Sequence, residues 1–123
     1  MNIPANLKYL KSHEWVKDCG GGLFEIGITD FAQKELGDIV YISLPRAGDG
    51  LKAGAPFADV ESVKAVSEIF SPVNGAVKEL NEQVITSPEL INQAPYDSWL
   101  IRAEGTAGEG LLTAGEYEKE VGK

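Results

Sequence analysis

The sequence predicts a small, mainly β domain, either a barrel or a sandwich, with short helices and a helix at its C-terminal end. Apolar residues recur at every second position in several short segments, which is the pattern of half-buried strands. Glycine, proline or asparagine bounds most of these segments, as is typical of antiparallel all-β domains. The 123 residues, 43% of them apolar, fit one domain, residues 1–123, whose core needs neither disulfides nor metal.

Alternating apolar residues place the strands. Three strand faces are predicted from the triplets Phe24, Ile26 and Ile28, then Val40, Ile42 and Leu44, then Trp99, Ile101 and Ala103. Two further strands, 58–61 and 65–70, form a predicted hairpin over about 56–71. A turn is expected at Asn74-Gly75, because Asn-Gly is a strong hairpin signal. A second turn is expected at the glycines 20–22 that follow Cys19.

Capping residues predict three short helices. One runs through Leu36 from a cap at Thr29 or Asp30 to Gly37, one has Ser87 as its cap and Pro88 at its first position, and one covers about 113–121 with a capping box of Thr113 and Glu116. The last of these is the C-terminal helix.

Composition excludes several function classes. Nineteen acidic residues against eleven basic ones give a formal charge of −8, which repels nucleic acid and anionic membranes. The same charge serves solubility, and it can also steer the chain toward basic patches on other proteins. One histidine and one cysteine are too few for a zinc site built from several such ligands, so no metal is expected.

The single cysteine and the N-terminus indicate a compartment. Cys19 has no partner for an intrachain disulfide and no basic neighbour, so we expect an inert thiol in a reducing compartment. The first residues lack a basic region followed by an apolar run, and no segment approaches membrane-spanning length. A bacterial cytoplasm is therefore expected, or a mitochondrial matrix if a transit peptide has been removed.

The sequence offers few side chains in the patterns typical of catalytic sites. A serine–histidine–acid triad would have to use His13, whose neighbours Ser12 and Glu14 are adjacent in sequence and are not placed in triad geometry by that fact. The glycines 20–22 lack the following lysine and serine or threonine of a phosphate-binding loop, so a turn explains them better.

One lysine stands out by its position. Lys64 lies at or near the tip of the predicted hairpin, where a flexible four-carbon stem projects into solvent and a modifying enzyme can acylate the amine. Any of the nine lysines is by default a solvated surface charge, so this geometry favours Lys64 only modestly.

The residues around Lys64 carry a resemblance. The segment 61–65, Glu-Ser-Val-Lys-Ala, followed by Ser-Pro-Val-Asn-Gly at 71–75, resembles the lipoyl-attachment motif of the glycine cleavage H proteins. In that motif an acidic residue precedes the lysine by three positions and alanine follows it, places filled here by Glu61 and Ala65. Biotin carriers typically have methionine on both sides of the lysine, so biotin is disfavoured.

The resemblance extends over nearly the whole chain. The segments that are similar to the family are 12–16, 27–38, 88–92, 95–96, 99–101 and 111–117. Ser98 departs from it, because the family usually has glycine before the tryptophan, and a positive φ there would strain a serine. Trp15 and His13 are expected to serve structure, as a core anchor and as a hydrogen-bonding residue, rather than to contact a cofactor.

The resemblance implies a fold and a function. The fold is the flattened β-barrel/sandwich hybrid of the lipoyl domains, and the chain is a monomeric carrier rather than an enzyme. Lipoate amide-linked to Lys64 would change the formal charge from −8 to −9. In the family the arm takes the aminomethyl group of glycine from the pyridoxal-phosphate glycine decarboxylase (P protein) to the folate-dependent aminomethyltransferase (T protein). Dihydrolipoyl dehydrogenase (L protein) reoxidises it, and a lipoate-attaching enzyme loads the lysine.

Two questions stay open from the sequence. Ser12, Glu14 and Glu68 are candidates for a cleft that receives the loaded arm, although Glu14 and Glu68 are equally explained as solvated strand carboxylates. The pathway has rivals as well: an H-protein-like lipoate relay, a carrier in sulfur metabolism, an unmodified interaction module or an enzyme.

Overall fold

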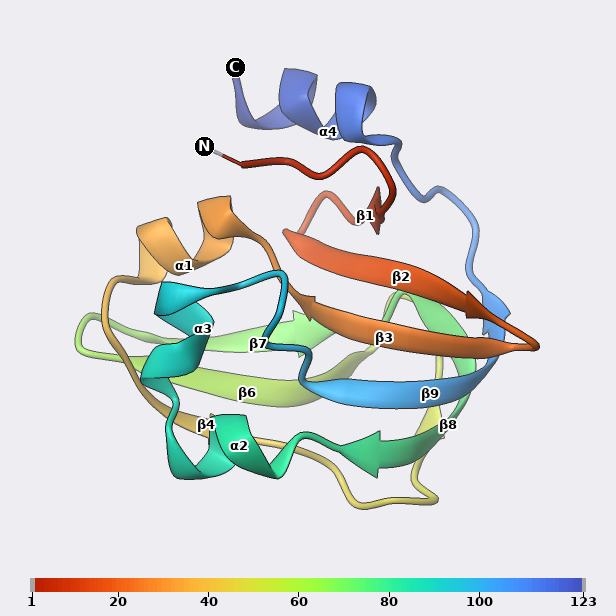
Figure 1. Cartoon of the computed structure of the whole chain (residues 1–123), viewed down its shortest axis with the longest axis horizontal. Helices are drawn as coiled ribbons and strands as arrows, with labels where there is room; N and C mark the ends of the chain where they lie inside the picture. The colour runs from red at the N-terminus through yellow and green to blue at the C-terminus, as the bar shows by residue number, and fades with distance from the viewer. Residues whose placement is uncertain (1, 123) are drawn as a thin grey trace.

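Two antiparallel sheets form the body of the chain in a computed structural model that describes residues 2–122 (Figure 1). The strands are β1 (Lys8–Tyr9), β2 (Glu14–Gly20), β3 (Leu23–Ile28), β4 (Ile39–Ser43), β5 (Gly50–Leu51), β6 (Pro56–Ser62), β7 (Val66–Phe70), β8 (Val73–Leu80) and β9 (Ile101–Ala107). One sheet has the order β1-β2-β3-β9-β8-β5 and the other the order β4-β6-β7. The predicted mainly β sandwich with short helices is confirmed, and it is not a closed barrel.

The first and last helices begin as predicted. Helix α1 (Asp30–Leu36) has Thr29 as its N-cap, whose hydroxyl accepts the Ala32 N–H, and it ends at Gly37. Helix α4 (Ala114–Val121) begins with the predicted capping box, in which Thr113 and Glu116 satisfy each other's backbone N–H groups. Figure 1 shows α4 beside the N-terminal segment, over one edge of the larger sheet.

The predicted helix after Ser87 is shifted, and another helix precedes it. Helix α2 (Glu82–Thr86) is capped by the side chain of Asn81, and Ser87 ends this helix instead of starting the next one. Helix α3 (Glu89–Gln93) begins after Pro88 with no side-chain cap. The prediction of Ser87 as a cap is therefore wrong, because Ser87 falls at the end of a helix that was not predicted. Five residues are too few to show helical periodicity in the sequence.

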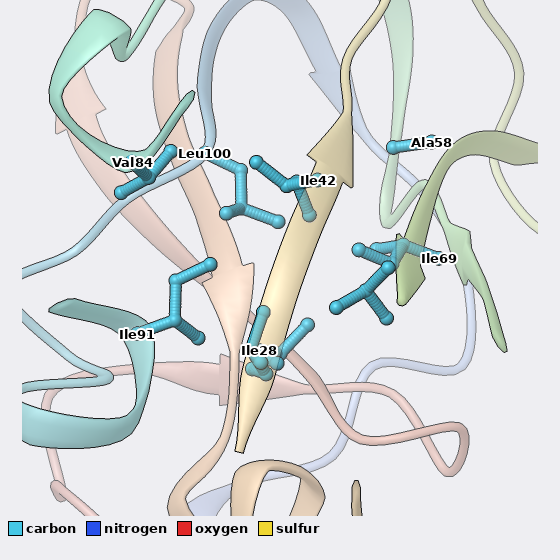
Figure 2. Packing of buried hydrophobic residues seen from close by; sticks show 9 residues of the cluster. Ile28, Ile42, Ala58, Ile69, Val84, Ile91 and Leu100 are labelled. Atoms are coloured by element: carbon cyan, nitrogen blue, oxygen red, sulfur yellow. The ribbon is translucent and has the colours of Figure 1, made fainter. Parts of the chain in front are cut away.

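The largest core cluster lies between the two sheets and extends under α2 and α3. Figure 2 shows Ile28, Ile42 and Ile69 pointing toward one another from strands of both sheets. Val84 and Ile91 bring the two short helices onto the same cluster. The helices therefore pack against β4 and help to fix it relative to the larger sheet.

The predicted face of β4 is wrong at one position. Val40 is 50% exposed, whereas Ile39 and Ile42 are buried. The register with β6 shifts between Ile39 and Tyr41, so a bulge breaks the strict alternation of sides. The bulge leaves Val40 and Tyr41 in solvent near the end of the β6–β7 hairpin.

The third triplet is also only partly a strand. Strand β9 begins at Ile101, and Leu100 and Ile101 are both completely buried, so Trp99 does not alternate with them. Trp99 is half-buried before the strand, and the guanidinium of Arg102 lies 4.2 Å from the centre of its ring. Arg102 also contacts Glu25 and thereby joins neighbouring strands.

The predicted turn between β2 and β3 is formed by Gly21 and Gly22, and Gly20 before them is the last residue of β2. All three glycines have positive φ. Cys19 lies at the exposed end of β2 rather than in the turn. The Asn74-Gly75 turn, in contrast, is wrong. Both residues lie inside β8, where Gly75 is paired with Gly105 of β9.

The reason for two paired glycines is the close approach of the two backbones. A Cβ built on Gly75 would lie 1.9 Å from the carbonyl oxygen of Glu104, and a Cβ on Gly105 would lie 1.9 Å from that of Asn74. Both glycines also have φ near +155°, which side chains rarely adopt. Glycine here therefore marks a close approach of two paired strands and not a hairpin turn.

Gly75→Ala is expected to destabilise the chain by about 3 kcal/mol, because the new methyl group must push two strands apart. Urea unfolding measures the effect. Gly115→Ala is the matched control, since nothing lies within 4 Å of that position in α4 and alanine favours a helix. Equal unfolding midpoints for the two variants would contradict the close approach of β8 and β9 at Gly75.

Candidate functional site

Lys64 lies at the turn that joins β6 to β7. Glu61 and Val66 are the last paired residues of the hairpin, and the turn between them is exposed at Lys64 and Ala65. In Figure 1 this turn projects at the left of the view, below α1. The structure therefore places Lys64 at the predicted tip, with Glu61 on the strand that leads to it and Ala65 next to it.

Ser62 holds the turn together. Its hydroxyl accepts the Lys64 N–H at 3.1 Å and the Ala65 N–H at 3.2 Å, and its own N–H donates to the Ala65 carbonyl at 2.8 Å. The side chain is only 6% exposed. Sequence reasoning missed this residue, although a serine two residues before a turn position is a known signal for such a hydroxyl-capped turn.

The end of α1 supports the same turn from the side. The Val63 N–H donates to the Asp38 carbonyl at 3.0 Å. The stem of Lys64 lies against Gly37, since a Cβ built there would be 3.4 Å from Cε of the lysine. Among the described residues the Lys64 amine makes no ion pair, so hydrogen bonds hold the backbone of the turn while the amine has no charged partner.

Glu14 of β2 is a buried carboxylate that lies beside Phe70, at the end of β7 away from the Lys64 turn. It is 2% exposed, accepts the Phe70 N–H at 2.9 Å and accepts the hydroxyl of Ser12. Burial raises the pKa of Glu14 to about 7, although the bonds from Phe70 and Ser12 lower it. Glu14 is therefore not the solvated strand carboxylate that the sequence left open.

A hollow of about 360 Å³ adjoins this carboxylate. It is lined by Leu10, Lys11, Ser12, Gly54, Phe70 and Gly110. Strand β7 leads from the turn at Lys64 to this hollow, a path of about 13 Å from Val66 to Phe70 at 3.3 Å per residue. A lysine side chain lengthened by an eight-carbon acyl group is comparable in length.

Glu68 lies elsewhere. It is exposed and stands opposite Asp59 of β6. It lines a separate hollow, also of about 360 Å³, together with Ser43 and Asp49 among others. The structure brings Ser12 and Glu14 together and leaves Glu68 apart from them.

His13 and Trp15 have the structural contacts that were predicted. The Nδ1 atom of His13 lies 2.9 Å from the hydroxyl of Tyr117, which joins the N-terminal segment to α4. Trp15 is 1% exposed and donates its indole N–H to the Pro95 carbonyl. His13 is the one non-glycine residue with positive φ among those described. Ser98 has no such strain, and its hydroxyl donates to the Leu90 carbonyl.

Other kinds of site are missing from the described residues. Within residues 2–122 no three histidine, cysteine, aspartate or glutamate side chains are grouped so that they could hold a metal ion. No helix in that range is both long and apolar enough to cross a bilayer.

The family model for the glycine cleavage H-protein matches residues 7–123. The chain belongs to this family. A glycine cleavage system H protein of Bacillus licheniformis is 52% identical over 125 residues, 98% of each chain, and one of Bacillus subtilis is 50% identical over 97% of this chain and 96% of its own. The crystal structure of a glycine cleavage system H protein from Mycobacterium marinum superposes with a TM-score of 0.92 at 36% identity, covering 98% of this chain and all of the other.

Membership decides the general function. An H protein is the lipoyl carrier of the glycine cleavage system, a component that bears a cofactor and is not itself a catalyst. The resemblance found in the sequence is therefore confirmed, and so is the prediction of a carrier rather than an enzyme.

The buried Glu14 carboxyl predicts a pH-dependent stability. Its pKa is about 7 in the folded chain against an ordinary 4.5 in the unfolded chain, so between these values only the folded chain holds the proton. The free energy of unfolding contributed by this group therefore falls as pH rises from 4.5 to about 7 and then levels off.

Glu14→Gln removes this titration. Relative to the unsubstituted chain, the variant is expected to gain roughly 3 kcal/mol as pH rises through that window. Urea unfolding of both proteins at a series of pH values measures the difference, in which all other groups cancel. A difference that does not change with pH would show that the carboxyl titrates normally.

Proposed function

We propose that Lys64 carries lipoate through an amide bond, and that the chain presents it in turn to the three enzymes of the glycine cleavage system. The observation that carries this proposal is the tip of the β6–β7 hairpin. There the backbone on both sides of Lys64 is fixed by Ser62 and Asp38, while the amine is free of ion pairs among the described residues.

The surroundings of Lys64 fit an attached group. The side chain leaves the body of the chain at an exposed turn, and it passes beside a residue without a side chain, Gly37. Attachment joins Nζ to the carbonyl carbon of an activated lipoyl donor, whose leaving group departs with the bonding electrons while the ammonium group loses two protons. The lysine then has no charge, and the lipoyl group supplies a cyclic disulfide on which the aminomethyl group of glycine is carried.

We place the resting position of the loaded arm at the hollow beside Ser12. The aminomethyl group is cationic, so a carboxylate next to the hollow stabilises it. Glu14 supplies that carboxylate, whose pKa is about 7. A nearby cation would lower this pKa and favour the charged form of the carboxylate. Glu68 lines the other hollow and is not part of this proposed position.

The proposed partners are the glycine decarboxylase (P protein), the aminomethyltransferase (T protein), dihydrolipoyl dehydrogenase (L protein) and the lipoate-attaching enzyme. Each of the first three must bring its own cofactor to the same arm, because the proposed role of this chain is to carry the arm and not to catalyse the steps. We propose a monomeric carrier in the bacterial cytoplasm, in keeping with its bacterial relatives.

Lys64→Arg keeps the positive charge but cannot be acylated. We expect intact mass spectrometry to find no lipoyl increment on the variant from a lipoate-replete host, and glycine-dependent carbon dioxide exchange with the decarboxylase to fall to background. Lys52→Arg, at another exposed lysine, is the control and should be modified fully. An increment that persists in Lys64→Arg would refute the assignment. A modified chain that supports no exchange would favour the relay or sulfur-carrier alternatives.

Replacing the carboxylates tests the arm-binding hollow. Glu14→Gln is expected to speed the loss of cargo from the loaded carrier roughly tenfold, because a charge-assisted hydrogen bond is lost. Glu68→Gln should have a smaller effect, since Glu68 lines a different hollow. The measurement is ammonia release over time, with Glu118→Gln as an exposed control. An unchanged rate removes that residue from the mechanism.

A further inference from the structure

The outward side of the three-stranded sheet carries apolar and acidic side chains in cross-strand rows. The register aligns Tyr41 with Glu61 and Glu61 with Val66, and one step further from the tip it aligns Asp59 with Glu68. Ala58 and Val60 of β6 are buried, so the alternate residues of that strand point to solvent. We call the five outward residues Tyr41, Asp59, Glu61, Val66 and Glu68 the tip face.

Apolar exposure is concentrated at this face and the adjoining turn. Five large hydrophobic side chains are exposed among the described residues, and four of them, Val40, Tyr41, Val63 and Val66, lie on β4 or the hairpin. Tyr41 is 56% exposed and Val66 is 67% exposed. Several exposed apolar residues gathered beside one lysine indicate a contact surface, whereas single exposed apolar residues need no explanation.

The charges of the tip face are unbalanced. Asp59 and Glu68 stand directly opposite each other, an arrangement of like charges that costs stability. Within residues 2–122 neither of them nor Glu61 forms a salt bridge. A partner with basic side chains would relieve this repulsion, and an apolar contact would cover Tyr41 and Val66.

The length of the lysine side chain identifies which partner meets this face. Before modification the amine stands only four carbons from the backbone, so an enzyme that acylates it must come into contact with the residues around the turn. Afterwards the reactive sulfurs lie at the end of a much longer arm, and enzymes acting on them can stay further from the sheet.

We propose that the tip face is the docking surface for the lipoate-attaching enzyme, which presents to it an apolar contact bordered by lysine or arginine side chains. The inference rests on the proposed lipoylation of Lys64. The apolar residues Tyr41 and Val66, on the two outer strands, supply binding energy on either side of Glu61. The carboxylates Asp59, Glu61 and Glu68 orient the approaching enzyme and speed its association.

The experiment compares lipoylation rates of the unmodified full chain. A purified lipoate-attaching enzyme and an activated lipoyl donor are supplied, and the mass increment is followed over time at limiting and saturating carrier. The Tyr41→Ser/Val66→Ser variant is expected to lower kcat/KM by about tenfold or more with kcat nearly unchanged. Ile85→Ser, which removes the fifth exposed apolar side chain, on α2, is the matched control and should behave as the unsubstituted chain.

A second pair of variants tests the contribution of the tip-face carboxylates. Asp59→Asn/Glu68→Gln is expected to lower kcat/KM at low salt and to approach the unsubstituted chain in high salt, because surface charges are screened. Glu82→Gln/Glu118→Gln removes the same charge from exposed positions outside the tip face and should have little effect.

A binding readout separates docking from chemistry. Lys64→Arg cannot be acylated, so it acts as a competitor of the unsubstituted chain for the attaching enzyme. Adding Tyr41→Ser/Val66→Ser to that competitor should raise its inhibition constant by the same factor as kcat/KM falls. If the double serine variant matched Ile85→Ser in both assays, the docking surface would be refuted while lipoylation stood. If the unsubstituted chain itself gained no mass, the proposed function would fail first.

Discussion

The hydroxyl of Ser62 accepts two backbone N–H groups inside the β6–β7 turn, and the position of Lys64 depends on this contact. A carrier needs a fixed base for a long side chain, because flexibility at the backbone would spread the arm over a larger volume and lower its effective concentration at a partner. Asp38, between α1 and β4, supports the other side of the turn through Val63. Both contacts restrain the backbone and, within residues 2–122, leave the side chain of Lys64 without a hydrogen bond to its own chain.

Glu14 shows a different balance between stability and function. A carboxylate at 2% exposure opposes folding in its charged form, as its raised pKa indicates. Hydrogen bonds from Phe70 and Ser12 offset part of this cost and place the group next to the hollow. Such an arrangement makes sense where a cation is to be held, because the charged form then gains a partner that the empty chain lacks.

Local signals in the sequence predicted much of the fold, and long-range constraints account for the errors. The cap at Thr29 and the box at Thr113 depend on residues a few positions apart, and both were predictable. The pairing of Gly75 with Gly105 joins segments thirty residues apart, so the same glycine was interpreted as a turn signal. Val40 was misplaced because a bulge is set by the partner strand.

The site divides in the same way. The position of Lys64 at the hairpin tip could be predicted because the segment around it is local, whereas the contacts of Ser62 require the closed turn. The separation of Glu14 from Glu68 depends on long-range packing, because β2 brings Glu14 to the Phe70 end of β7 while Glu68 faces Asp59 further along the hairpin. The proposed tip face and the hollow beside Ser12 share no residue, although Val66, Glu68 and Phe70 alternate onto one side of β7. A loading surface and a cargo hollow built from different residues would let the same turn serve both.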